Sequence, residues 1–307
     1  MTAPTVTRLK RAASPITAGA PGPTGKVRFP VIGWVGAGIV AAAAAVAMFA
    51  PRLAGYRVTE LAGEPLEAPS ASHLLGTNVV GQDVASQMVY GARMSLFIAI
   101  VAGGLTVFAG ALIGMTAGWL GGKVDALIMR LVDVVLVIPS LPLLIVLGAY
   151  AGPSMTTIAV IIAATAWPPS SRVIRSQVLS LRRRAHLQAS VGFGARTPHV
   201  LRHHVLPDVG LILAAGFVGA ASRAVMMEAG LAFLGLGDPT RASWGRVMRD
   251  AIDFDALFNT TAWSWWLLPP AIAIAVFLLG MTFLGIGLEQ RINPRLVRHG
   301  SSQRRPR

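Results

Sequence analysis

The chain has 307 residues, of which 54% are hydrophobic and only 13% are charged, and its formal net charge is +14. Soluble domains carry about 25% charged residues, so this composition excludes a disordered chain and argues against an ordinary soluble domain. The apolar residues are gathered in long runs, and a membrane-spanning helix needs about 20 of them in succession. The sequence therefore predicts an all-α polytopic membrane protein.

The N-terminal part predicts a tail followed by one span. Residues 1–28 are rich in Pro, Ala and Thr and carry basic but no acidic residues, which is typical of a disordered basic tail. The apolar run 29–50 is long enough for a first transmembrane helix. Its Ala-Val-Ala at 45–47 resembles a signal-peptide cleavage site, but the run exceeds the usual core of about 7–15 residues, so a retained helix is favoured.

A polar segment, 51–92, comes next and is too long for a hairpin loop, so we expect it to be partly ordered on the external face. A core transmembrane domain, 93–290, follows, and a basic tail, 291–307, closes the chain. Five further apolar runs predict spans at 94–118, 124–148, 154–170, 208–234 and 266–288. The second span is rich in glycine, which suits close helix packing in lipid.

The distribution of charge predicts the orientation. Most of the 27 Lys and Arg lie in 1–28, 119–133, 171–208 and 289–307, and the segments between them hold more acidic than basic residues. Loops rich in Lys and Arg stay on the cytoplasmic side of a membrane, so we expect both termini in the cytoplasm of a multi-pass cell-membrane protein. The basic charge then needs no nucleic-acid partner.

Several kinds of site are missing from the sequence. There is no Cys, so a thiolate metal site, a disulfide and a Cys nucleophile are excluded. None of the six His lies four residues from another on a plainly apolar helix face, as a helical zinc pair would require. No Gly-x-x-x-x-Gly-Lys-Ser/Thr phosphate loop is present. We therefore expect no metal, no cofactor and no catalytic residue, and the chain is not expected to be an enzyme.

The long connection 171–208 has a pattern of its own. Val173, Ile174 and Val178 form a helical apolar stripe beside a run of arginines, and glycine and proline interrupt the segment further on. Short jointed helices of this kind can dock into a groove of a cytoplasmic partner. An amphipathic helix on anionic lipid has the same pattern, and spacing alone leaves both interpretations open.

The spacing within this connection resembles the coupling loop, or EAA loop, of ABC importer permeases. That family pattern runs Glu-Ala-Ala, three residues, Gly, and then Leu-Pro with the Leu twelve positions after the Gly. The matching positions here are Gln188, Ala189, Gly194, Ala195, His204, Leu206 and Pro207. Gln188 departs from the pattern, since it can donate and accept hydrogen bonds but lacks the charge of the usual Glu.

Other segments resemble the same family in the same order, over about residues 70–295. They are the run from His73 to Asp83, Tyr90 to Arg93, Asp125 with Arg130 and Asp133, Trp167 with Arg172 and Arg175, Glu228 to Gly237, Trp244-Gly245, and Asn293 to Arg295. The ordered set resembles the second permease subunit of the dipeptide/oligopeptide/nickel importer family. Gln82 departs from it, because the family usually has Arg there.

The resemblance implies a type I ABC importer permease fold with six transmembrane helices and a cytoplasmic coupling loop. The implied function is binding-protein-dependent import of di- or oligopeptides. The implied partners are a second permease subunit in a heterodimer, one or two ABC ATPase subunits that hydrolyse ATP, an extracytoplasmic solute-binding protein and membrane lipid. A nickel or metal-chelate importer is the alternative within the family. An ATP-independent secondary transporter or channel is the alternative outside it.

Arg223 and Glu228 are the candidate residues of the translocation path. They are the only charges deep in the fifth predicted span, and charges within a membrane are functional hypotheses by default. A bond to another span or to the partner permease is the alternative role for each residue.

Two local arrangements are also expected. Arg130 and Asp133 are three residues apart and can pair on one helix face. Trp263, Trp265 and Trp266 predict an aromatic belt at the membrane interface, where indole rings are enriched.

Overall fold

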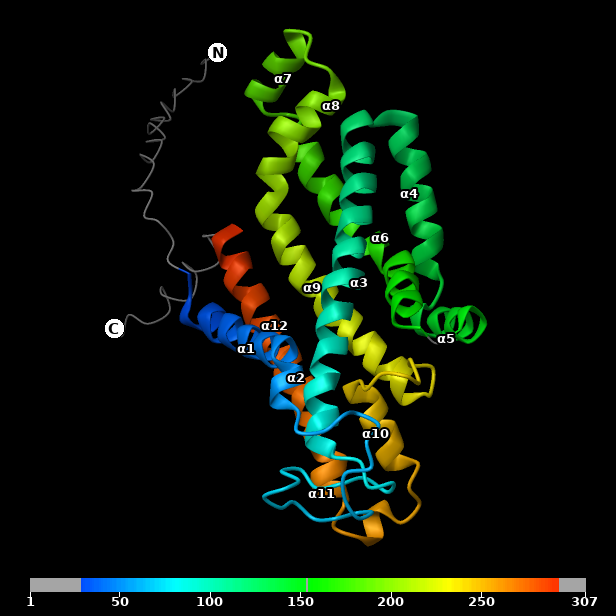
Figure 1. The fold of residues 1–307 in the computed structure, drawn as a ribbon. Coiled ribbons are helices and arrows are strands. Elements are labelled where there is room, and N and C mark those ends of the chain that lie inside the picture. The colour runs from blue at the N-terminus through cyan, green and yellow to red at the C-terminus, as the bar shows by residue number, and fades with distance from the viewer. Residues whose placement is uncertain (1–28, 153, 293–307) are drawn as a thin grey trace, which may run out of the picture.

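A computed structural model describes residues 29–152 and 154–292, so the predicted tail 1–28 and nearly all of 291–307 lie outside the described residues. The described residues form helices and connections, with two isolated β-bridges and no strand (Figure 1). The helices are α1 (Val31–Met48), α2 (Ala50–Leu53), α3 (Val84–Leu120), α4 (Gly122–Val137), α5 (Ser140–Ala151), α6 (Met155–Leu181), α7 (Ala185–Gly192), α8 (Thr197–Val200), the π-helical turn η1 (Leu201–Val205), α9 (Leu206–Phe233), α10 (Trp244–Ile252), the 3-10 turn η2 (Leu257–Asn259), α11 (Trp263–Trp266) and α12 (Leu268–Ile292).

The membrane-spanning helices confirm the predicted fold class. Five helical stretches among the described residues are long and apolar enough to cross a membrane, and the bent pair α4–α5 brings the number to six if it is counted as one span. The five stretches are Val31–Met48, Val84–Leu120, Met155–Leu181, Thr197–Phe233 and Trp263–Arg291. The chain is an all-α polytopic membrane protein.

The third predicted span, 124–148, is wrong as one straight helix. α4 and α5 are bent by 82° with respect to each other. Ile138 has an extended backbone (ψ 123°), as residues before proline prefer, and Pro139 is the N-cap of α5. α5 therefore projects sideways from the bundle (Figure 1).

The fourth predicted span, 154–170, is too short. α6 continues through Pro168 and Pro169 to Leu181, so the connection that follows is 182–205 and not 171–208. The Ser171 hydroxyl donates to the Pro168 carbonyl at 2.7 Å, and Ile174 and Val178 are buried. Packing against neighbouring helices compensates for the prolines, as membrane bundles allow.

α3 is the central helix and packs most extensively against α6 and then α9 (Figure 1). Glycine permits these close approaches. A Cβ added at Gly103 would lie 2.9 Å from the Ala221 Cα, and one added at Gly114 would lie 2.5 Å from the Ser171 carbonyl oxygen. A Cβ added at Gly104 would meet nothing within 4 Å. The glycines of the predicted span therefore permit close packing only on the faces of α3 that meet α6 and α9.

α1 packs along α12 through a second set of glycines. A Cβ added at Gly36 would lie 2.4 Å from the Leu284 nitrogen, and one added at Gly287 would lie 2.7 Å from the Gly33 Cα. The first helix is thus a packed part of the bundle, next to α12 in Figure 1.

Two ion pairs join α4 to α6. Arg175 donates to both carboxylate oxygens of Asp125, at 2.6 Å from Nη2 to Oδ2, and Arg172 pairs with Asp133. The expected pairing of Arg130 with Asp133 is wrong, because Asp133 bonds across to the next helix instead of along its own.

The connections at the α10–α11 end form an ordered cap. His73 Nδ1 lies 3.1 Å from Asp83 Oδ1, and the other Asp83 oxygen accepts the Ser86 backbone N–H at 2.7 Å and so caps α3. α3 consequently begins at Val84, ten residues before the predicted span. Backbone hydrogen bonds and two β-bridges order the chain between Ala62 and Asp83, within the segment 51–92 that is expected to be external.

The tryptophans near α11 do not all form an interfacial belt. Trp266 is completely buried in a cluster with Val84 and Leu257, whereas 43% of Trp263 is exposed. The belt prediction is therefore wrong for Trp266, which packs in the core of the cap.

Candidate coupling loop and translocation residues

The predicted coupling-loop residues gather at one end of the molecule, where α7 and α8 lie beyond the tips of the long helices (Figure 1). Gln188 and Ala189 lie on α7, and Gly194 and Ala195 form the turn after it. His204 lies in η1, which runs directly into Leu206 and Pro207 in the first turn of α9. Proline is tolerated there because the first N–H groups of a helix have no intrahelical partner.

Gly194 ends α7 by adopting a left-handed backbone, with φ +84°. Its N–H donates to the Val191 carbonyl at 2.9 Å, and the Ala195 N–H donates to the Ser190 carbonyl at 3.1 Å. This is the usual glycine helix stop. A Cβ at Gly194 would meet nothing within 4 Å, so glycine is needed for its backbone conformation and not for space.

Leu187 anchors α7 to the rest of the protein. Only 1% of it is exposed, and it belongs to a cluster drawn from α3, α6, α8, η1 and α9, which comprises Ala111, Trp119, Ile174, Val178, Leu181, Val200, Val205 and Val209. Burial of one leucine side chain stabilises a fold by about 1.5–3 kcal/mol. Leu187 therefore links α7 to α3, α6 and α9 through one buried cluster. Sequence analysis missed this residue.

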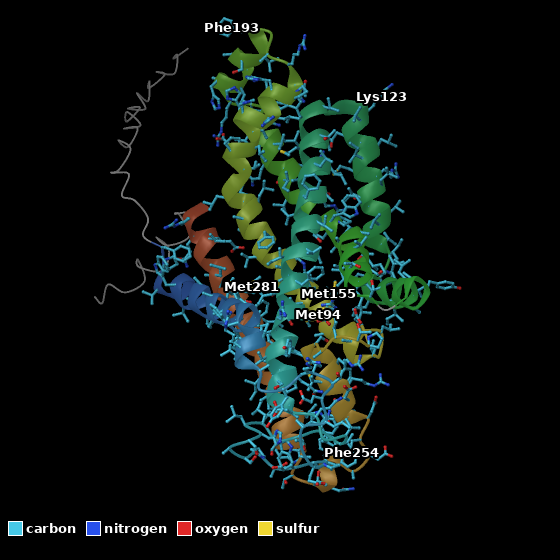
Figure 2. The ribbon with its side chains drawn as sticks, in the orientation of Figure 1. Met94, Lys123, Met155, Phe193, Phe254 and Met281 are labelled. Atoms are coloured by element: carbon cyan, nitrogen blue, oxygen red, sulfur yellow. The ribbon has the colours of Figure 1, made fainter. Side chains whose placement is uncertain are left out.

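The opposite side of α7 faces outward. Gln188 and Ala189 are exposed, and the exposed fractions of Val191 and Phe193 are 49% and 93%. Figure 2 shows Phe193 at the tip of the molecule. Exposed arginines, among them Arg183 and Arg196, flank the same loop. Aromatic residues and arginine are enriched where proteins bind proteins, so this composition suits a docking surface.

Arg223 points into a hollow of about 380 Å³ between α3, α6, α9 and α12, whose walls include Val107, Ser170, Val173, Gln177, Arg223 and Glu289. We call this the Arg223–Glu289 hollow. In the sequence Glu289 belongs to the charged C-terminal segment 289–307, and only the fold brings it next to α9, the fifth predicted span.

Glu228 lies elsewhere. Only 1% of it is exposed, and neither carboxylate oxygen has a hydrogen-bond partner among the described residues. The next residue, Ala229, lies against α10, since a Cβ added at Gly245 would come within 2.3 Å of its carbonyl oxygen. The structure thus does not bring Arg223 and Glu228 into one site.

A second hollow, of about 760 Å³, opens near the α10–α11 end between α3, the start of α6 and the segment before α10. Its lining includes Tyr90, Arg93, Phe97, Met155, Asp238 and Arg241. Figure 2 shows two of its residues, Met94 and Met155, near the middle of the molecule. Burial alone would raise the pKa of Asp238, but hydrogen bonds from Thr240 and the Met155 N–H, with the charge of Arg241, hold it below its usual value.

Residues 110–298 match the sequence family described as the binding-protein-dependent transport system inner membrane component. The chain belongs to this family. The predicted membership of the ABC importer permeases is therefore confirmed.

Two relatives carry names that describe their cargo. The dipeptide transport system permease protein DppC of Bacillus subtilis is 34% identical over 232 residues, which cover 75% of this chain and 71% of that protein. The protein of the same name from Alkalihalophilus pseudofirmus is 32% identical over 265 residues, which cover 85% of each chain. Neither name refers to nickel, so the nickel alternative is not favoured.

Proposed function

We propose that this chain is the permease subunit of an ATP-driven importer of di- and oligopeptides in the cell inner membrane. Family membership supports the transport role, and the names of the two relatives support the peptide cargo. The observation that carries the coupling part of the proposal is the α7–α8 loop, with Leu187 buried on one side and Phe193 exposed on the other.

The loop acts as a lever in this proposal. One or two separate ATPase subunits hydrolyse ATP and hold the exposed side of α7, around Gln188 and Phe193. Their movement is passed through Leu187 to α3, α6 and α9, which shift between outward- and inward-facing states. ATP binding and solute access are then coupled because both favour one of two arrangements of the spans.

The proposed assembly has further subunits. A second permease completes the translocation path, in a heterodimer, and an extracytoplasmic solute-binding protein delivers peptide at the α10–α11 end. The excess of Lys and Arg near the other end supports a cytoplasmic location for α7, α8 and both termini. Membrane lipid surrounds the remaining helix faces.

Gln188 alters the chemistry of docking. A glutamine can donate and accept hydrogen bonds but cannot form an ion pair with an arginine or lysine of the ATPase. We propose that docking here relies on the apolar contact of Phe193 and on the flanking arginines, so the ATPase groove is apolar with acidic residues at its rim.

Arg223 and Glu228 have different roles in the proposed path. Arg223 lines the Arg223–Glu289 hollow and is available to a solute. Glu228 is sealed from solvent in this single chain, so it would meet solute only in a state where α9 and α10 separate.

The test is purification of the complex from mild detergent, followed by peptide uptake in proteoliposomes. We expect the second permease and the ATPases to copurify, with uptake that requires ATP. Phe193→Ser should reduce ATPase copurification, whereas Phe258→Ser, an equally polar change at an exposed phenylalanine in η2, should not. A chain that purifies alone and moves solute without ATP would establish the secondary-transporter alternative.

A further inference from the structure

We propose that the Arg223–Glu289 hollow recognises the two charged ends of a zwitterionic peptide. This inference rests on the proposed function and deepens it. Arg223 would bind the terminal carboxylate and Glu289 the terminal ammonium group. Arg223 has no counterpart in the family pattern that the sequence resembles, so the assignment concerns this chain's own residues.

The two charges share the hollow without neutralising each other. Both line it, one from α9 and the other from the end of α12, and among the described residues neither takes part in an ion pair. An arginine within a membrane is costly unless it has a partner or faces a polar cavity. The hollow supplies a few polar groups, from Ser170, Gln177 and Glu289, among largely apolar walls, and a bound carboxylate would supply the partner.

Two glycines of α9 leave space for the Arg223 side chain in the hollow. Gly216 and Gly219 line the same hollow, and a Cβ at Gly219 would lie 3.6 Å from Arg223 Nη1. The guanidinium group therefore extends along α9 towards the α7–α8 end, over a glycine. Glu289 lies close to the end of α12 and lines the same hollow. The two opposite charges thus border one opening.

The size and walls suit a short peptide. The volume of about 380 Å³ is within the range of about 300–1,000 Å³ typical of ligand pockets. The ends of an extended dipeptide are roughly 7 Å apart, which is a separation that two residues on adjacent helices can bridge. Apolar walls from Val107, Val173 and Ile212 contact any side chain without selecting for one, while Ser170 and Gln177 supply neutral hydrogen-bonding groups.

The test compares three probes with the intact complex in proteoliposomes: Ala-Ala, N-acetyl-Ala-Ala and Ala-Ala-amide. For each probe, uptake by a variant is divided by uptake by the wild type, which cancels the preference of the binding protein. Arg223→Gln should reduce this ratio roughly tenfold or more for the two probes with a free carboxylate, and should spare the amide. Glu289→Gln should do so for the two probes with a free amine, and should spare the acetylated peptide.

Matched variants exclude a loss of structure. Arg130→Gln removes an exposed arginine of α4 outside the hollow and should leave all three ratios unchanged. Arg223→Lys keeps the charge and should keep the discrimination. If Arg223→Gln fails to assemble, Glu289→Gln decides the matter, since Glu289 is exposed near the end of α12.

The outcomes separate this inference from the proposed function. If the wild-type complex takes up peptide and the variants lose uptake equally for all three probes, the inference alone is overturned. The hollow would then bind a zwitterionic lipid headgroup instead of the peptide. The absence of ATP-dependent peptide uptake by the wild-type complex would overturn the proposed function and this inference together.

Discussion

Arg184 pairs with Asp208 across the base of the α7–α8 loop, with 3.2 Å between Nη1 and Oδ2. Arg184 is the N-cap of α7, and Asp208 lies in the first turn of α9. The pair therefore joins the start of the α7–α8 loop to α9, the span that follows the loop.

Asp208→Asn should weaken coupling more than stability. The exposed fractions of the two side chains are 57% and 37%, and exposed ion pairs contribute only about 0–1 kcal/mol. We expect thermal unfolding of the complex to change by a few degrees at most, while the amount of peptide moved per ATP hydrolysed falls. Asp253→Asn, which removes the carboxylate of the exposed Arg249–Asp253 pair at the α10 end, is the control. Equal effects of the two variants would show that only the net charge of the subunit matters.

Leu187→Ala should uncouple the complex through packing. Removal of a buried leucine costs about 2–5 kcal/mol, and here the loss falls on the contact between α7 and the spans. ATP hydrolysis should continue while uptake falls several-fold. Leu127→Ala, the same change at an exposed leucine of α4 away from the loop, should leave uptake per ATP nearly unchanged. Retained coupling in Leu187→Ala would contradict the assignment of Leu187 as the anchor.

The uptake retained by a Gly194 variant should depend on how well the new residue tolerates a left-handed backbone, and not on the size of its side chain. The left-handed region costs a residue with a Cβ about 1–2 kcal/mol, and asparagine tolerates it better than alanine. Since the space around a Cβ is empty, Gly194→Asn should retain more uptake than Gly194→Ala, although Asn is larger. The opposite order would indicate that crowding against a partner subunit, and not backbone strain, explains the glycine.

Asp238 should stabilise the complex in a pH-dependent way. Its pKa is below the value of about 4 that an unfolded chain would have. Its contribution is therefore present above pH 4 and is lost as the pH falls through the lower, folded-state pKa. The difference in melting temperature between wild type and Asp238→Asn should be constant from pH 7 to 5 and should shrink below pH 4. A difference that grows on acidification would contradict this sign.

The fold was predictable where the signal is local. Apolar runs give the number of crossings because span length and hydropathy depend on each segment alone. Prolines were harder to interpret. Pro139 bends the third crossing, whereas α6 continues through Pro168 and Pro169. Packing against α3 stabilises the continuous α6 helix, and the sequence around the two prolines does not reveal that packing.

The site was predictable in part for the same reason. The position of Gly194 follows from loop spacing, because a helix stop is a local requirement. The roles of Leu187 and Phe193 depend on which side of α7 meets the protein. The pairs formed by Arg172 and Arg175 span 39 and 50 residues of sequence, so only the fold reveals them.

Phe193 also bears on how the subunit is made. Phe193 is 93% exposed and Val191, two residues before it, is 49% exposed, and contiguous apolar surface favours self-association while no partner covers it. A cell that made this chain in excess of the proposed ATPase subunits would leave this apolar surface uncovered. Balanced synthesis of the subunits, or prompt proteolysis of the surplus, would follow.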